Sequence, residues 1–153
     1  MRFMLLMIPQ GYEKATPGSM PDAKAVEAMM KYNESLQKAR VLLTLDGLHP
    51  PSMGARVTFS GGKSKVIDGP FAEAKETLGG YWMIQVNSKE EAIEWASRCP
   101  ASDNEIVEVR QVQEFSEFPA EVRATASGFP EMQARKIRSA EGELNIEQEA
   151  CCC

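Results

Sequence analysis

Residues 79–91, GGYWMIQVNSKEE, decide the fold expected for this chain. Aromatic and apolar residues fill Tyr81–Val86 and predict a strand that is entered through two glycines. Ser88 and Glu91 fit the capping box, in which a serine and a glutamate three residues later satisfy backbone donors at a helix start. The helix that begins there should end at Pro100. This stretch therefore predicts a strand–helix unit.

Segments on either side of this unit extend the pattern. The expected elements are a strand at 2–8, a helix from about Pro21 to Arg40, a strand at 41–45, a β-hairpin of 56–59 with 65–67, and a last strand at 106–112. The first helix should bury Val26, Met29, Met30 and Leu36, with Asn33 on the same face. Gly61 and Gly62 supply the positive φ angles that a tight hairpin turn needs.

Without the hairpin, the order of elements is β-α-β-β-α-β, the ferredoxin-like α+β pattern. Both helices should cover one face of the sheet. The other face carries alternate residues of Tyr81–Val86, which are too apolar to remain in water. We therefore expect a homodimer that packs sheet on sheet.

Composition excludes several classes of protein. The chain has 153 residues, is 43% hydrophobic and has a net charge of −5, which suits one folded domain and lacks the basic surface of a nucleic-acid binder. The apolar run at 2–8 is too short to span a membrane, so no membrane partner is expected. Cys99 is isolated and the other three cysteines end the chain, so no disulfide framework forms and a cytoplasmic location is expected.

The character of the sequence changes near Phe118. We expect residues 1–118 to form the α+β domain and residues 119–153 to form an extension, partly helical and frayed at its end. Helices are predicted at 120–127 and 131–140. The final Cys151, Cys152 and Cys153 fit no prenylation motif. The sequence assigns no role to this extension.

Ionisable side chains are dense in the loop that follows the hairpin. Residues 66–82 read VIDGPFAEAKETLGGYW and contain Asp68, Glu73, Lys75 and Glu76. Carboxylates beside a lysine can carry out acid–base chemistry. Equally, Asp68 can simply cap the turn while the other charges face solvent.

The same loop resembles the YCII-related family, in its type with an Asp-Gly-Pro-Phe motif. The resemblance rests on Asp68–Glu73, Lys75–Glu76 and Leu78–Tyr81, with further landmarks at Trp95–Pro100 and Val107–Arg110. It covers roughly residues 1–112 and implies a dimeric α+β barrel. It also implies an aspartate in a cleft between helix and sheet, and an association with extracytoplasmic-function sigma factors. It implies no defined reaction.

The resemblance places the family's aspartate at Asp68. The helix histidine of its shorter members would fall near Tyr32 or Asn33, where this chain has none. Asn33 interrupts the apolar face of the first helix and is expected to point into the cleft, but an amide cannot act as a general base.

His49, the single histidine, lies after the second strand and has a side chain suited to carrying protons near neutral pH. An exposed loop histidine is the simpler interpretation. One histidine and scattered carboxylates are too few for a structural zinc site. Neither glycine pair opens a helix, so the sequence predicts no phosphate cradle and no cofactor.

The leading hypothesis is a small cytoplasmic homodimer that binds a small ligand or a regulatory partner in a cleft near Asp68. The first alternative is an acid–base enzyme with Asp68 as base and Glu73, Lys75 or His49 assisting, and the second is a sigma-factor partner. The residues expected to bind the ligand are Asn33, Tyr32, Phe71, Glu73, Lys75, Glu76 and Tyr81.

Overall fold

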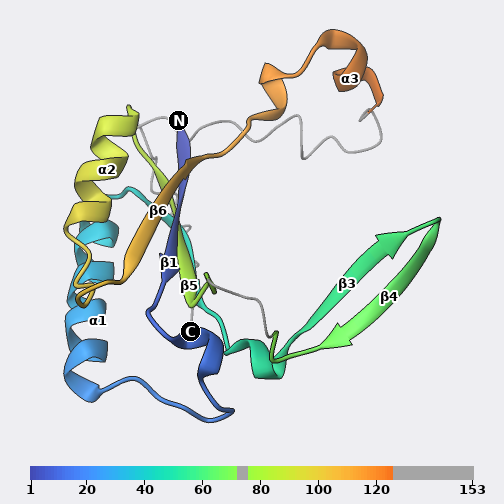
Figure 1. Cartoon of the computed structure of the whole chain (residues 1–153). Coiled ribbons are helices and arrows are strands. Elements are labelled where there is room, and N and C mark those ends of the chain that lie inside the picture. Colours follow the sequence, from blue (N-terminus) through green and yellow to red (C-terminus); the bar gives the residue numbers. More distant parts are fainter. Residues whose placement is uncertain (72–75, 126–153) are drawn as a thin grey trace, which may run out of the picture. The chain divides into compact units, whose positions relative to one another are not determined.

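The computed structural model describes residues 1–71 and 76–125, which fall into two compact units, 1–112 and 113–153. Figure 1 shows the elements in chain order. The strands are β1 (Arg2–Ile8), β2 (Leu42–Gly47), β3 (Ala55–Ser60), β4 (Lys63–Asp68), β5 (Gly80–Gln85) and β6 (Ile106–Gln111). The α-helices are α1 (Ala23–Lys38), α2 (Lys89–Ser97) and α3 (Ala120–Thr125), and short 3-10 turns lie at Tyr12–Lys14, Pro51–Met53 and Phe115–Glu117.

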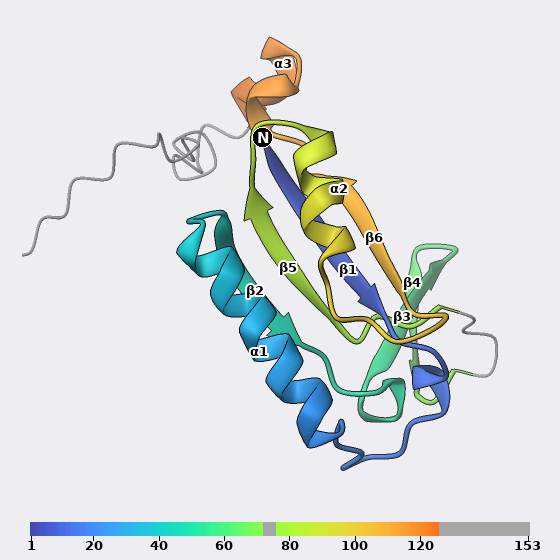
Figure 2. The same ribbon diagram turned by 90° about the vertical axis from the view of Figure 1, so that its left-hand side faces the viewer.

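Four strands form an antiparallel sheet in the order β2-β5-β1-β6, and β3 and β4 form a separate two-stranded sheet. Helices α1 and α2 cover the same face of the four-stranded sheet (Figure 2). The ferredoxin-like α+β fold with an inserted hairpin is therefore confirmed.

The hydrophobic core lies between the four-stranded sheet and the two helices. Phe3, Leu5 and Ile84 are at most 1% exposed, and Leu36 of α1 and Ala92 of α2 are fully buried against the sheet. The alternation of β5 places one set of its side chains on this face, as its sequence predicts.

The apolar face predicted for α1 is partly wrong. Val26 and Met30 are 42% and 49% exposed, whereas Met29, Tyr32 and Leu36 contact the core. The helix begins after Asp22, whose carboxylate accepts hydrogen bonds from the backbone N–H groups of Lys24 and Ala25. The buried face is therefore shifted round the helix toward Tyr32.

The capping box at α2 is formed in part. The Ser88 hydroxyl accepts a hydrogen bond from the Glu91 N–H at 3.1 Å, as expected. The Glu91 carboxylate accepts from the backbone N–H of Asn87 at 2.9 Å, one residue earlier than a capping box requires. Asn87 also donates its side-chain amide to the same oxygen, which explains the preference.

Neither α1 nor α2 covers the opposite face of the four-stranded sheet. The register pairs Met4 with Met83 and Leu6 with Tyr81 on this face. Met4 and Met83 are half-buried, and Leu6 is 8% exposed. We call this surface the uncovered face.

The hairpin of β3 and β4 turns at Gly61 and Gly62, whose φ angles are 57° and 74°. These positive values confirm the expected role of the two glycines, because L-residues with a side chain rarely adopt them. All twelve strand residues of the hairpin are exposed.

Residues 113–153 are described only as far as Thr125. In this unit the rings of Phe115 and Phe118 lie 5.8 Å apart, and α3 accounts for most of the helix predicted at 120–127. The helix predicted at 131–140 and the cysteines Cys151, Cys152 and Cys153 lie outside the described residues.

Candidate functional site

The loops at one end of the four-stranded sheet are tied to one another by backbone hydrogen bonds. Leu48 donates its N–H to the Gly79 carbonyl at 2.8 Å, and Gly79 donates to Met7 at 2.8 Å. Gly69 donates to the Gly54 carbonyl at 2.9 Å. These bonds hold the segment after β2, the base of the hairpin and the entry to β5 in fixed positions.

Gly69, the glycine of the Asp-Gly-Pro-Phe motif, has a steric reason to lack a side chain. A Cβ atom at this position would lie 1.7 Å from the Pro51 carbonyl oxygen and 3.2 Å from that of Gly54. The backbone after β4 therefore packs directly on the turn Pro51–Met53. Gly79 is similarly confined, because a Cβ there would lie 2.5 Å from Cγ of Pro9.

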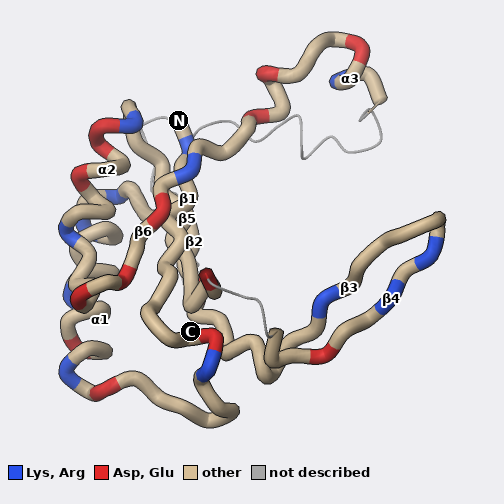
Figure 3. Tube along the Cα trace, in the orientation of Figure 1, with Lys and Arg blue, Asp and Glu red and all other residues tan. Residues whose placement is uncertain are grey.

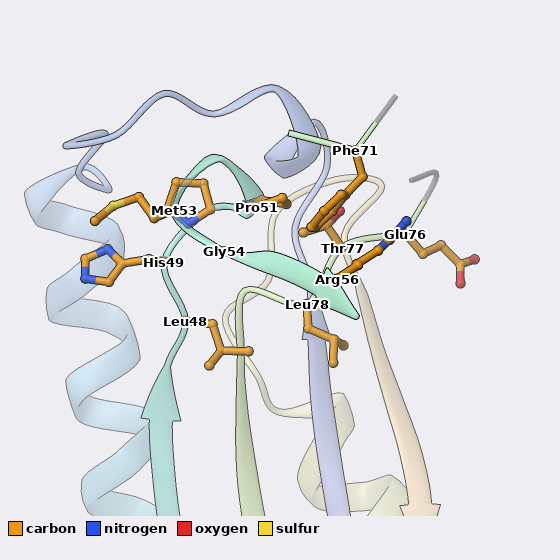
Figure 4. A pocket seen from close by; sticks show the side chains of 11 residues that line it. Leu48, His49, Pro51, Met53, Gly54, Arg56, Phe71, Glu76, Thr77 and Leu78 are labelled. Atoms are coloured by element: carbon orange, nitrogen blue, oxygen red, sulfur yellow. The ribbon is translucent and has the colours of Figure 1, made fainter. Parts of the chain in front are cut away.

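These loops enclose an open, mostly apolar pocket of about 520 Å³. Such a volume lies within the range of about 300–1,000 Å³ that is typical of small-molecule sites. Its lining residues are Leu48, His49, Pro50, Pro51, Met53, Gly54, Arg56, Phe71, Glu76, Thr77 and Leu78 (Figure 4).

Arg56 and Phe71 form the most defined contact in the pocket. The guanidinium carbon of Arg56 lies 4.0 Å from the centroid of the Phe71 ring. This cation–π contact fixes the position of the positive charge while leaving the edge of the guanidinium able to donate hydrogen bonds. No carboxylate forms an ion pair with Arg56 among the residues described.

His49 and Glu76 occupy other parts of the lining. Figure 4 shows the imidazole of His49 beside Met53, at the opposite end of the pocket from Arg56. The same view shows the carboxylate of Glu76 directed away from the other lining side chains. The pocket therefore contains the Arg56 guanidinium, which contacts the Phe71 ring, and the His49 imidazole. The apolar side chains of Leu48 and Leu78 also line it.

Asp68 does not line this pocket. It ends β4, pairs in register with Ala55 and is exposed. Of the other residues of the motif, Phe71 lines the pocket with its ring, and Gly69 packs against Pro51, which also lines it.

Tyr32 lies in the hydrophobic core, and the half-buried Asn33 lies beside it. Asn33 Oδ1 accepts a hydrogen bond from Trp82 Nε1 at 2.7 Å, and the Tyr32 hydroxyl donates to the Trp95 carbonyl at 3.0 Å. The Tyr32 and Trp82 rings meet edge to face, with centroids 5.5 Å apart. Burial raises the pKa of Tyr32, so its hydroxyl remains a donor at neutral pH. The structure therefore does not bring Asn33 and Tyr32 together with Asp68.

Tyr81 lies on the uncovered face and not in the pocket. Its hydroxyl donates to Asp46 Oδ2 at 2.8 Å across the strand pair. This hydrogen bond raises the pKa of Tyr81, because the bond is made by the protonated form. Glu73 and Lys75, the remaining predicted ligand residues, lie outside the described residues.

Sequence reasoning missed Arg56 and the apolar residues of the segment that follows β2. Arg56 sits in an alternating strand, where a charged residue is usually explained by exposure. A usable signal was the segment Leu48-His49-Pro50-Pro51, because a residue that precedes a proline is kept out of the α-helical region.

The described residues contain no group of three or more histidine, cysteine or acidic side chains able to hold a metal ion. Cys99, two residues after the end of α2, packs against the core. Burial, followed by the nearby Glu105 carboxylate, raises the pKa of the Cys99 thiol to about 11, so it stays protonated and is a weak nucleophile at neutral pH. No helix in the described part of the chain is long and apolar enough to cross a membrane.

Comparison with known proteins agrees with the fold. The YCII-related domain family matches residues 1–116. The chain therefore belongs to the YCII-related family. A curated relative, an uncharacterized protein of Rhizobium meliloti (strain 1021), is 43% identical over 49 residues, which are 32% of this chain and 40% of the relative. The match thus spans well under half the length of that relative.

Proposed function

We propose that this YCII-related protein is a cytoplasmic homodimer whose pocket binds a small molecule with an apolar body and one anionic group. The observation that carries the proposal is the Arg56 guanidinium, which is stacked on Phe71 at 4.0 Å and lines a mostly apolar pocket. An arginine held against an aromatic ring can donate its N–H groups to a carboxylate with little further loss of side-chain freedom.

The apolar part of such a ligand would cover Leu48 and Leu78, which are 42% and 39% exposed. Burying these two side chains supplies the non-directional part of the binding energy. The anionic group then fixes orientation through Arg56, and His49 at the other end can contact a polar substituent.

A matched pair of probes tests this function. We expect 2-naphthoate to bind about fivefold more tightly than neutral 2-naphthamide in isothermal titration calorimetry, since an exposed ion pair contributes up to ~1 kcal/mol. Arg56→Gln should reduce that ratio to about one while retaining the apolar contribution. Arg110→Gln, which removes an exposed arginine from β6, is the control. Equal binding of the two probes by the unaltered protein would contradict the proposal.

The uncovered face supports the dimeric part of the proposal. Met4 and Met83 pair across β1 and β5 on this face, which neither α1 nor α2 covers. Two copies packed sheet on sheet would bury these side chains. An association with an extracytoplasmic-function sigma factor stays a prediction.

Acid–base catalysis is a second candidate because His49 lines the same pocket as Arg56. In this version His49 replaces Asp68 as the base, since Asp68 does not line the pocket. Phenylpyruvate combines an aromatic body, a carboxylate and acidic C3 protons, so its deuterium exchange in D₂O is a suitable assay. The enzyme hypothesis predicts accelerated exchange that His49→Asn abolishes and Asp68→Asn retains. Exchange no faster than in buffer would rule it out for this substrate.

A further inference from the structure

The β3–β4 hairpin has one apolar face and one basic face. The register places Ala55, Val57, Phe59, Ser64, Val66 and Asp68 on the first face. The opposite face holds Arg56, Thr58, Ser60, Lys63, Lys65 and Ile67. Phe59, Val66 and Val57 are 80%, 61% and 52% exposed, so the apolar face is open to solvent.

A two-stranded hairpin gains little stability on its own in water. The β3–β4 ladder is separate from the four-stranded sheet, and the hairpin extends on the side of that sheet away from α1 and α2 (Figures 1 and 2). A hairpin with three large exposed apolar side chains on one face is therefore built to be covered by another surface.

Charge favours a second copy of this chain as that surface. Three basic residues and one acidic residue give residues 55–68 a net charge of +2, and the remaining 14 basic and 21 acidic residues give the rest of the chain −7. Figure 3 shows the basic positions along β3 and β4 in blue. Arg56, Lys63 and Lys65 lie on the face opposite the apolar one, so their attraction to the acidic remainder of another copy guides the approach, while the apolar face makes the contact.

Symmetry supplies the area that one hairpin lacks. A stable interface buries about 800 Å² on each partner, which is more than one short hairpin face offers. In a twofold dimer each copy contributes its own hairpin and also receives the partner's, so every contact occurs twice. The sheet-to-sheet contact of the proposed dimer adds to this area.

We propose that the β3–β4 hairpin is a dimerisation arm whose apolar face, formed by Val57, Phe59 and Val66, packs against a second copy of the chain. This inference rests on the homodimer of the proposed function and assigns it an additional contact. The arm explains why the apolar side chains of β3 and β4 alternate although every strand residue of the hairpin is exposed.

The test compares a double variant on the apolar face with a single variant on the opposite face, at the neighbour of Val66. The variant F59T/V66T changes the apolar face, and I67T changes the other face with the same kind of substitution and retained β-propensity. Sedimentation equilibrium of the full chain should show a dimer whose dissociation constant rises about 100-fold in F59T/V66T, equivalent to about 2.7 kcal/mol. In I67T the constant should change less than about threefold, which is under 1 kcal/mol.

A photo-crosslinking amino acid at position 59, in a mixture of isotope-labelled and unlabelled chains, locates the contact. Crosslinks between labelled and unlabelled chains support the arm. Crosslinks only within a chain overturn it, and circular dichroism confirms that each variant is folded. Equal dissociation constants for F59T/V66T and I67T would overturn the arm alone, and a monomer at 100 µM would overturn the arm together with the proposed dimer.

Discussion

The four-stranded sheet and the hairpin differ in burial although both are made of strongly β-forming sequence. Every second residue of β5 is buried, whereas every residue of β3 and β4 is exposed. The difference follows from connectivity, because α1 follows β1 and α2 follows β5, and these helices fold back on the sheet. The link between β3 and β4 is a two-glycine turn, which leaves no helix to cover the hairpin. Alternation in a sequence thus predicts strands, but a covering element decides whether they form a core.

Identical substitutions in the two regions should give the largest contrast. Ile84→Ala removes a fully buried side chain from β5 and should lower the free energy of unfolding by about 2–5 kcal/mol. Ile67→Ala acts on a side chain of β4 that is 42% exposed and should cost less than about 1 kcal/mol. Urea denaturation followed by circular dichroism measures both. Similar losses in the two variants would contradict the assignment of the core.

Gly69→Ala tests whether the pocket loops are held as rigidly as the sheet. The new Cβ would overlap the Pro51 carbonyl oxygen, so we expect a loss of about 1–3 kcal/mol and weaker 2-naphthoate binding. Gly47→Ala is the matched control, because a Cβ there meets no atom within 4 Å. A Gly69→Ala variant as stable as Gly47→Ala would show that the loop packing is not tight.

Asn33→Ala should act on the core and leave the pocket unchanged. It removes the acceptor of the Trp82 indole N–H and leaves a largely buried donor unsatisfied, at a cost of about 1–3 kcal/mol. The Trp82 indole resonance should shift in the NMR spectrum while the affinity for 2-naphthoate stays the same. Loss of ligand affinity without loss of stability would show that Asn33 contacts the ligand, as the sequence predicted.

The pH dependence of Cys99 alkylation tests whether this thiol is buried against the core. In a variant with Ser at 151–153, alkylation of Cys99 should follow an apparent pKa of about 11, above the ordinary 9.0, since burial disfavours the thiolate. The resulting stabilisation is complete below pH 9 and is lost as pH rises through about 11. Iodoacetamide alkylation rates across this pH range give the apparent pKa of the thiol. A value of 9 would contradict the burial of Cys99.

Asp68→Asn should have the smallest effect. Asp68 is exposed at the end of β4 and lines no described pocket, so stability and 2-naphthoate affinity should change by less than about 0.5 kcal/mol. Thermal unfolding and calorimetry on the same samples check this. A large loss of stability would instead show that the Asp68 carboxylate caps the turn after β4.

The order of the elements could be predicted from the sequence because each strand and helix carries its own local signal. Ser88 and the pair Gly61 and Gly62 mark a helix start and a turn without reference to the rest of the chain. The buried face of α1 was predicted less well, because Tyr32 carries a polar hydroxyl and becomes a core residue only when the Trp95 carbonyl accepts its hydrogen bond.

The pocket could be predicted only in outline. Its residues come from three separate segments, and Arg56 gains a role only when the chain places Phe71 beside it. The motif at 68–71 does mark this region, but the physical reason is the close packing of Gly69 on Pro51 and the ring of Phe71. The carboxylate of Asp68, the most chemically suggestive group of the motif, lies outside the pocket lining.

The most direct test of the account is a titration of the ¹⁵N-labelled full chain with 2-naphthoate, followed by amide chemical shifts. The account predicts shifts concentrated at residues 48–56, 71 and 76–78, with little change at Asn33, whose Oδ1 accepts a hydrogen bond from the Trp82 indole N–H. Shifts confined to Met4, Leu6 and Met83 would place binding on the uncovered face and contradict the proposed site.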